Sequence, residues 1–190
     1  MTVVAPLKAI TPVEYLEFEI DSQERHEYRQ GEIIKMTGGT PTHNEIIGAL
    51  TVIFRVMLKG RPLQVFVTDQ RLYIPNRQVY TYPDVMVVAR PIVLQGGRQD
   101  TVTEPILIVE VLSKSTKNYD RGEKFADYRS IPTFQEYLLI DQTKPHVEHY
   151  LKQGTNQWLL REYSQLENQL QLSSLAIELS LAEIYENVDF

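Results

Sequence analysis

A seven-residue apolar run that contains a single charge constrains the fold more than any other feature of the chain. Residues 106–112 read ILIVEVL, and Glu110 is the one charged side chain among them. Successive side chains of a strand point to opposite faces, so a strand formed by this run is apolar on both faces. The run therefore predicts a central strand in a sheet that is covered on both sides.

Helix and strand signals alternate around this run. Thr11 opens a capping box with Pro12 at the first helical position, which predicts a helix through Phe18. Thr42 is predicted to cap a second helix, because apolar residues recur at helical spacing as far as Met57. The other predicted elements are strands over 26–29, 32–36, 63–68, 70–74, 79–88, 106–112, 135–141, 146–151 and 157–163, a helix over 119–129 and a short helix capped by Ser180.

The order of these elements predicts an α/β fold of the mixed α+β kind. We expect a central mixed sheet flanked by helices, with extra antiparallel strands toward the C-terminus. No internal repeat, low-complexity tract or Gly/Ser-rich linker interrupts the 190 residues. Because this length suits one large domain with a sizeable core, we expect a single domain over residues 1–190.

Composition and missing motifs exclude several classes of function. The chain has no cysteine, which excludes disulfide scaffolds, thiolate metal sites and cysteine nucleophiles. No run of 18 apolar residues occurs, and Met1 to Ile10 lack the segment order of a secretion signal. The phosphate-binding loop that ends in Gly-Lys-Ser/Thr is absent, and so is the Gly-x-Ser-x-Gly elbow. We therefore expect a cytoplasmic protein with no membrane partner.

The charge distribution bears on nucleic-acid binding. A net charge of −6 opposes it, because phosphate binding needs a basic surface. However, residues 71–129 contain nine basic and seven acidic side chains, whereas one arginine and six carboxylates follow Leu160. The middle of the chain therefore remains compatible with a nucleic-acid partner.

Glu110 is the first candidate functional residue. On the predicted strand it shares a face with Ile108 and Leu112, and a buried charge is unfavourable unless a cation or hydrogen-bond donors meet it. Three structural interpretations remain open: a position at the rim of the sheet, an ion pair with an arginine, or a protonated carboxyl group. The functional interpretation is a ligand for a cation.

Asp84 is a second isolated acid that enters an apolar strand. Pro83 marks a bulge, an edge or a first strand residue, because proline cannot donate to a strand ladder. A Pro-Asp pair is common in turns and is a weak signal alone. If the strands of Asp84 and Glu110 are neighbours, both carboxylates reach one cation. Such oxygen ligands, completed by water, suit Mg²⁺.

Lys124 lies on the next predicted helix, four residues after Asp120 and four before Tyr128. The simplest interpretation is an exposed Asp–Lys pair worth a few tenths of a kcal/mol. The preceding loop, residues 113–118, is rich in hydroxyl and ammonium groups, as expected around phosphate oxygens. A lysine beside a metal-bound water can orient that water or stabilise a phosphorane-like transition state.

Short motifs follow one another in an informative order. They are Gly31-Glu32-Ile33, Met36, Gly38, His43, Pro83-Asp84-Val85, Glu110-Val111-Leu112-Ser113, Ser115-Thr116, Asp120, Lys124, Tyr128, Glu136-Tyr137 and Asp141. As an ordered set they resemble the Uma2 family, restriction-endonuclease-like proteins of the PD-(D/E)XK nuclease superfamily, over roughly residues 10–150. The resemblance implies a central mixed sheet and Mg²⁺- or Mn²⁺-dependent hydrolysis of phosphodiester bonds. It also implies Asp84 and Glu110 as metal ligands, with the main-chain oxygen of Val111 as a further candidate.

One position departs from the superfamily pattern. That pattern places a lysine two residues after the second acid, where this chain has Leu112. The resemblance implies that the lysine has moved to the following helix, at Lys124. Lys114 is the nearer rival, although the common form of the family has proline there. The implied catalytic set is Asp84, Glu110 and Lys124.

Other polar residues are weaker candidates. His43 begins the long predicted helix, where a structural role is more common. Glu32 on the predicted hairpin would be an additional acid for the metal. His146 and His149 are three residues apart in a predicted strand, so they point to opposite faces and a shared zinc ion is disfavoured.

Three functional hypotheses remain. The leading one is a Mg²⁺-dependent DNA endonuclease, expected as a homodimer because cutting both strands commonly uses two copies. The alternative is a non-catalytic nucleic-acid- or protein-binding module on a nuclease scaffold, which the acidic balance and the displaced lysine favour. The third is a structural domain that dimerises through a sheet edge or its C-terminal strands.

Overall fold

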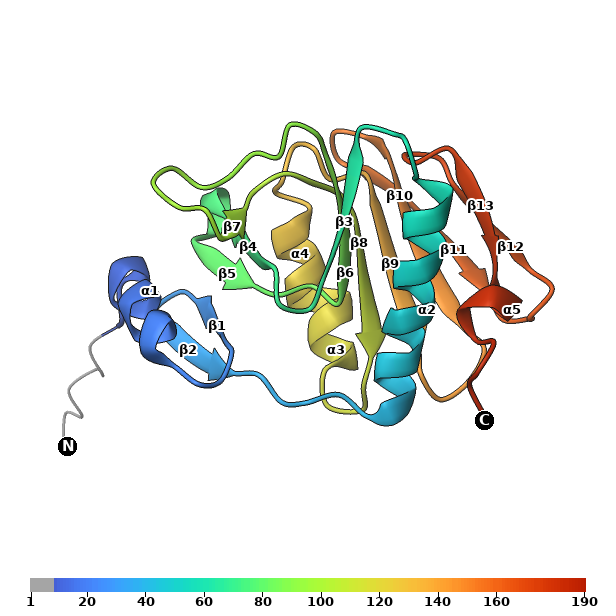
Figure 1. Cartoon of the computed structure of the whole chain (residues 1–190), viewed down its shortest axis with the longest axis horizontal. Coiled ribbons are helices and arrows are strands. Elements are labelled where there is room, and N and C mark those ends of the chain that lie inside the picture. Colours follow the sequence, from blue (N-terminus) through green and yellow to red (C-terminus); the bar gives the residue numbers. More distant parts are fainter. Residues whose placement is uncertain (1–8) are drawn as a thin grey trace.

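A six-stranded mixed sheet forms the centre of the computed structural model, which describes residues 9–190 (Figure 1). In spatial order its strands are β11 (Gln157–Tyr163), β10 (Val147–Gly154), β9 (Glu136–Asp141), β8 (Pro105–Leu112), β6 (Val85–Ala89) and β3 (Leu63–Val67). β8 and β9 are parallel, and the other neighbours are antiparallel. β8 is interior and almost entirely buried, as its apolar run predicts.

A smaller five-stranded sheet occupies the left of the view in Figure 1. In spatial order its strands are β2 (Glu32–Lys35), β1 (His26–Arg29), β5 (Val79–Thr81), β4 (Arg71–Ile74) and β7 (Thr101–Val102). β1 and β2 form the predicted hairpin, whose turn holds Gln30 at φ 48° and Gly31 at φ 94°. Two-residue hairpin turns of this kind need positive φ at both positions, which glycine adopts without strain.

Helical segments pack against both sheets. They are α1 (Pro12–Asp21), α2 (Pro41–Met57), the 3₁₀ turn η1 (Pro75–Arg77), α3 (Lys117–Tyr119), the π-helical turn η2 (Asp120–Lys124), α4 (Phe125–Tyr128) and α5 (Leu181–Ile184). α3, η2 and α4 follow one another without a break, and residues 117–128 are called the crossover helix below. The crossover helix connects the parallel strands β8 and β9 and corresponds to the helix predicted over 119–129.

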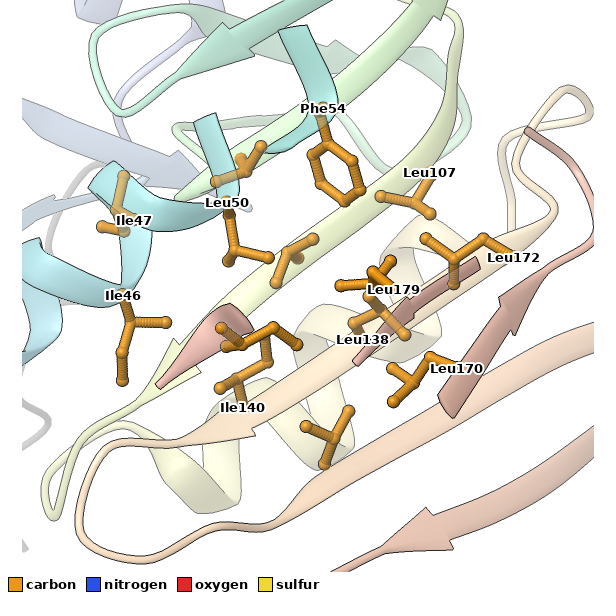
Figure 2. Packing of buried hydrophobic residues seen from close by; sticks show 14 of the residues in the cluster. Ile46, Ile47, Leu50, Phe54, Leu107, Leu138, Ile140, Leu170, Leu172 and Leu179 are labelled. Atoms are coloured by element: carbon orange, nitrogen blue, oxygen red, sulfur yellow. The ribbon is translucent and has the colours of Figure 1, made fainter. Parts of the chain in front are cut away.

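The larger hydrophobic core lies on one face of the six-stranded sheet. Ile46, Leu50 and Phe54 of α2 point toward this face (Figure 2). The C-terminal hairpin of β12 (Gln169–Leu172) and β13 (Ile177–Ser180) covers the same face together with α5. The helical spacing of apolar residues in α2 therefore corresponds to the side that meets the sheet.

The crossover helix covers the opposite face. Phe125 and Tyr128 belong to the same buried cluster as Ile108 and Leu112 of β8. Glu110 lies between those two apolar residues with the same orientation on the strand, so its carboxyl group faces the crossover helix.

The start of α2 differs from the sequence-based prediction. Thr40, not Thr42, is the N-cap residue, since Thr40 Oγ1 accepts a hydrogen bond from the His43 N–H. Pro41 then takes the first helical position, where a missing N–H is tolerated. The prediction of a cap at Thr42 was therefore wrong by two residues.

The strand predicted over 79–88 is two strands in two different sheets. β5 belongs to the small sheet and β6 to the large one, and the chain changes sheet at Tyr82 and Pro83. Proline cannot donate a ladder hydrogen bond, which explains the break at this position. Asp84 therefore lies at the point where the chain enters the large sheet.

The structure tests the predictions for the C-terminal end of the chain but not those for its first residues. The expectation about a secretion signal in residues 1–10 falls mostly on residues 1–8, which lie outside the described part of the chain. Within residues 9–190, no helix is both long and apolar enough to cross a membrane. The predicted cap at Ser180 is present with its capping box, whereas β12 and β13 were not predicted.

Removing a core side chain of α2 tests this packing. Leu50 is fully buried, whereas Val52 on the same helix is 64% exposed. We expect Leu50→Ala to lower the free energy of unfolding by about 2–5 kcal/mol, because it deletes methyl groups and leaves a cavity. Val52→Ala should change it by less than about 0.5 kcal/mol. Urea denaturation of the two variants checks this, and equal effects would contradict the packing.

Candidate functional site

Asp84 lies beside the carboxyl end of β8. Its Oδ2 atom accepts a hydrogen bond from the Val111 N–H at 2.7 Å and lies 3.2 Å from His43 Nε2. β6 and β8 are antiparallel neighbours, so the residue before β6 lies next to the last residues of β8. The strand pairing therefore brings Asp84 to the segment that contains Glu110.

Glu110 is buried and paired with Lys124. Lys124 Nζ lies 3.0 Å from Glu110 Oε1, and the Tyr128 hydroxyl donates a hydrogen bond to the same oxygen at 2.6 Å. Both partners come from the crossover helix, where a spacing of four residues puts them on one side. Within residues 9–190, no arginine forms an ion pair with Glu110 or Asp84, which removes the interpretation of Glu110 as the partner of a structural arginine.

Two further carboxyl groups surround Lys124. Its Nζ lies 3.5 Å from Glu27 Oε1 of β1 and 3.7 Å from Asp120 Oδ1 of η2. Glu27 also accepts hydrogen bonds from Thr81 Oγ1 and, at 3.4 Å, from the Tyr119 hydroxyl. Glu27 thereby connects the small sheet to the crossover helix.

These groups line one pocket of about 620 Å³. Its charged floor consists of four carboxyl groups and one ammonium group, from Glu27, Asp84, Glu110, Asp120 and Lys124. The residues at 34–40 and the loop at 113–116 also line the pocket, and several of them are exposed at its rim. The floor therefore holds more acidic groups than basic groups, and most of them are buried. Binding of a cation there would compensate the excess negative charge.

The pKa values of the floor reflect this crowding. Burial has the largest effect on Glu110 and raises its pKa to about 8, with Asp84 and Asp120 adding to the rise and Lys124 opposing it. Burial would lower the pKa of Lys124, but the surrounding carboxyl groups, Glu110 first, hold it well above its usual range. Burial and the neighbouring acids therefore make Glu110 easier to protonate than an exposed glutamate, while Lys124 stays charged.

His43 borders the site from the first turn of α2. Burial lowers its pKa, but the hydrogen bond and the charge of Asp84 outweigh burial and leave the pKa above its usual value. Gly39 leaves room for the ring, because a Cβ atom there would lie 2.6 Å from His43 Nδ1. The contact with Asp84 gives His43 the role of orienting that carboxylate.

The pocket can be compared with the residues selected from the sequence. Asp84, Glu110 and Lys124 all line it, and Lys114 is exposed at its rim. Glu32 is exposed and does not line it, whereas Glu27, which the sequence analysis missed, does. Glu27 lies in the polar strand β1, so no apolar run marked it as Glu110 was marked, and only the pairing of β1 with β5 makes β1 an interior strand.

The donor set fits a hard divalent cation. Within the described residues, both polar contacts of Asp84 use Oδ2, which leaves Oδ1 available to a cation. Within residues 9–190, no three or more His, Asp or Glu side chains lie so that they could hold a metal ion by themselves. Two carboxylates completed by water and substrate oxygens match the preference of Mg²⁺, which keeps several waters.

Comparison with known proteins identifies relatives along nearly the whole chain. The model of the Uma2 family, described as "Putative restriction endonuclease", matches residues 12–183. The uncharacterized protein sll1609 of Synechocystis is 45% identical over 162 residues, which cover 85% of this chain and 92% of that protein. The uncharacterized protein slr1290 of the same organism is 37% identical over 188 residues, or 98% of this chain and 96% of that protein.

A solved structure has the same fold. It is the crystal structure of "a putative nuclease belonging to DUF820" from Anabaena variabilis, with a TM-score of 0.75 and 19% sequence identity. The superposition covers 93% of this chain and 98% of the other. At this identity the likeness concerns the fold, and it confirms the predicted mixed α/β architecture.

The raised pKa of Glu110 predicts how stability depends on pH. The unfolded chain has an ordinary glutamate pKa near 4.5, so the folded protein binds this proton more tightly. The resulting stabilisation is complete below about pH 4.5 and is lost as the pH rises through about 8. The unfolding free energy of wild type minus that of Glu110→Gln should therefore fall across this window, by at most about 1.4 kcal/mol per pH unit. Urea denaturation without divalent metal measures the difference, and a difference that rises with pH would contradict it.

Proposed function

This chain belongs to the Uma2 family, and we propose that it is a Mg²⁺-dependent endonuclease that hydrolyses phosphodiester bonds of DNA. The observation that carries the proposal is the pocket that Asp84 and Glu110 both line, with Lys124 Nζ 3.0 Å from Glu110 Oε1. Two carboxylates and a lysine are the groups that metal-dependent phosphodiester hydrolysis needs from a protein.

Asp84 and Glu110 are the proposed metal ligands, and Mn²⁺ is an alternative to Mg²⁺. A divalent cation bound there supplies a Lewis acid for the phosphate and an acidified water as nucleophile. Glu110 must lose its proton to become a ligand, so its raised pKa couples cation binding to proton release. His43 and the Val111 N–H hold Asp84 Oδ2 in place.

Lys124 is the proposed catalytic lysine. Its Nζ atom stays charged, because three carboxyl groups lie within 3.7 Å of it. From the side of Glu110 the ammonium group can orient the attacking water and stabilise negative charge on the phosphate in the transition state. Lys114 at the exposed rim is better placed to contact a phosphate away from the cleaved bond.

The organisation of the chain supports treating it as one unit. Glu27 of the small sheet and Glu110 of the large sheet both contact Lys124, so the pocket needs both sheets. We therefore propose that the chain acts as a single domain. The homodimer expected from the sequence has no support from the comparisons, and the proposed chemistry does not depend on it.

Substitution of the metal ligands tests the proposed activity. Asp84→Asn and Glu110→Gln should each lower Mg²⁺-dependent cleavage of plasmid and oligonucleotide DNA at least about 100-fold, because each removes a cation ligand. Asp69→Asn is the matched control, since Asp69 is 83% exposed and pairs with Arg25 rather than with the pocket. Cleavage is measured by gel electrophoresis, and Mg²⁺ binding by calorimetry.

Two results would reject the proposed function. Equal cleavage by wild type and both ligand variants would identify a contaminating nuclease. Nucleic-acid binding without cleavage, and without Mg²⁺ binding that depends on Asp84 and Glu110, would favour the alternative of a non-catalytic binding module.

Glu27 provides a second test, as a positioning residue for Lys124. Glu27→Gln removes a carboxylate 3.5 Å from Lys124 Nζ, and we expect kcat to fall about 10- to 100-fold with little change in KM. In a Lys124→Met background the same substitution should have almost no further effect. Glu32→Gln, an exposed acid on the neighbouring strand, should leave kcat unchanged. Additive losses in the double variant would contradict a role through Lys124.

A further inference from the structure

The rim of the pocket combines two segments of different chemistry. The first, called the strap here, is residues 34–40, which lead from β2 into α2. The second, called the hydroxyl loop, is residues 113–116 between β8 and the crossover helix. Figure 1 shows the connection from β2 to α2 passing the edge of the sheet where β8 ends.

The strap is attached at both ends. At one end the Met36 N–H donates to the Arg25 carbonyl oxygen at 2.9 Å. At the other end Thr40 Oγ1 donates to Gln142 Oε1, and Gln142 Nε2 donates to the Leu112 carbonyl oxygen at 2.9 Å. The strap is therefore held at a defined position relative to β8 and the charged floor.

The strap presents apolar side chains to the pocket. Ile34 lines the pocket with 38% of its surface exposed, and Met36, two residues further along the chain, also lines it. Ile34 is partly exposed at the mouth of the pocket, whose floor is strongly acidic. Apolar side chains at the rim of a charged pocket suit a ligand with two parts, one flat and weakly polar and the other charged.

The hydroxyl loop presents polar groups. Ser113 Oγ lies 3.0 Å from Ser115 Oγ and 3.0 Å from Thr116 Oγ1. Lys114 of this loop lines the pocket and is exposed, Lys117 is exposed at the start of the crossover helix, and within residues 9–190 neither forms an ion pair. Hydroxyl and ammonium groups of this kind bind phosphate oxygens.

We infer that the pocket receives an unpaired DNA strand, with a base against Ile34 and Met36 and its phosphates along the hydroxyl loop. This inference rests on the proposed function and names its substrate class. An unpaired nucleotide offers both an exposed base face and a phosphate, which are the two surfaces that the rim matches.

An intact duplex fits the pocket less well. Its bases are stacked, so their faces are not available to the strap, and it would meet the protein mainly through phosphates. Glu110 and Lys124 are also recessed, at 3% and 8% exposure, in a pocket of about 620 Å³. A single strand bends into such a recess more easily than the stiff duplex does.

The first experiment compares substrates. A 5′-labelled single-stranded DNA oligonucleotide is incubated with full-length protein and Mg²⁺, and the same oligonucleotide is tested after annealing to its complement. We expect the single strand to be cleaved at least about 10-fold faster, and a duplex with an unpaired flap to be cut in the flap. Equal or faster cleavage of the plain duplex would overturn the inference and leave the proposed endonuclease intact.

The second experiment tests the strap. Ile34→Ser combined with Met36→Ser should raise KM for the single strand at least about 5-fold and change kcat less than 2-fold. Val52→Ser combined with Val56→Ser is the matched control, since these α2 side chains are 64% and 69% exposed and do not line the pocket. Thermal melting by circular dichroism confirms that the variants fold. An unchanged KM in the folded strap variant would overturn the inference.

Failure of the inference and failure of the proposed function have different signatures. If the wild type cleaves neither substrate in a manner that depends on Asp84 and Glu110, the endonuclease proposal fails together with the inference. If cleavage depends on both acids but shows no preference for the single strand, only the inference fails.

Discussion

The contact between Glu110 and Lys124 is the interaction on which the site depends. A buried carboxyl group and a buried ammonium group add little net stability as a pair, but removal of either partner leaves the other without compensation. In this protein the pair lies among three more carboxyl groups, so the ammonium is strongly held while Glu110 keeps a raised pKa. These buried groups include more acidic than basic side chains. A bound divalent cation would balance the excess negative charge.

The topology of the sheet explains how the proposed catalytic lysine can lie on a helix. The crossover helix must pack on β8 because it connects two adjacent parallel strands, and it covers the face from which Glu110 projects. Lys124 therefore approaches Glu110 from the covering layer rather than from the strand. Leu112, two residues after Glu110 on the strand, belongs to the buried cluster beneath this helix.

Much of the fold was predictable because its signals are local. The apolar run around Glu110, the capping boxes at Thr11 and Ser180 and the hairpin turn at Gly31 each depend on a few adjacent residues. The prediction of the α2 N-cap was wrong because more than one nearby residue could cap the helix. Thr40 and Thr42 are both acceptable cap residues on composition, and only the hydrogen bond from the His43 N–H distinguishes them.

The sequence by itself determined that two isolated acids enter apolar strands and that a lysine follows on a helix, because strand and helix periodicities depend only on the order of residues. Tertiary structure alone decided that Glu27, rather than Glu32, reaches Lys124. It also decided that the strap crosses near the same pocket, since Thr40 and Gln142 are 102 residues apart. Contacts of this kind arise from how separate sheets and loops pack together, and no periodic pattern within a segment encodes them.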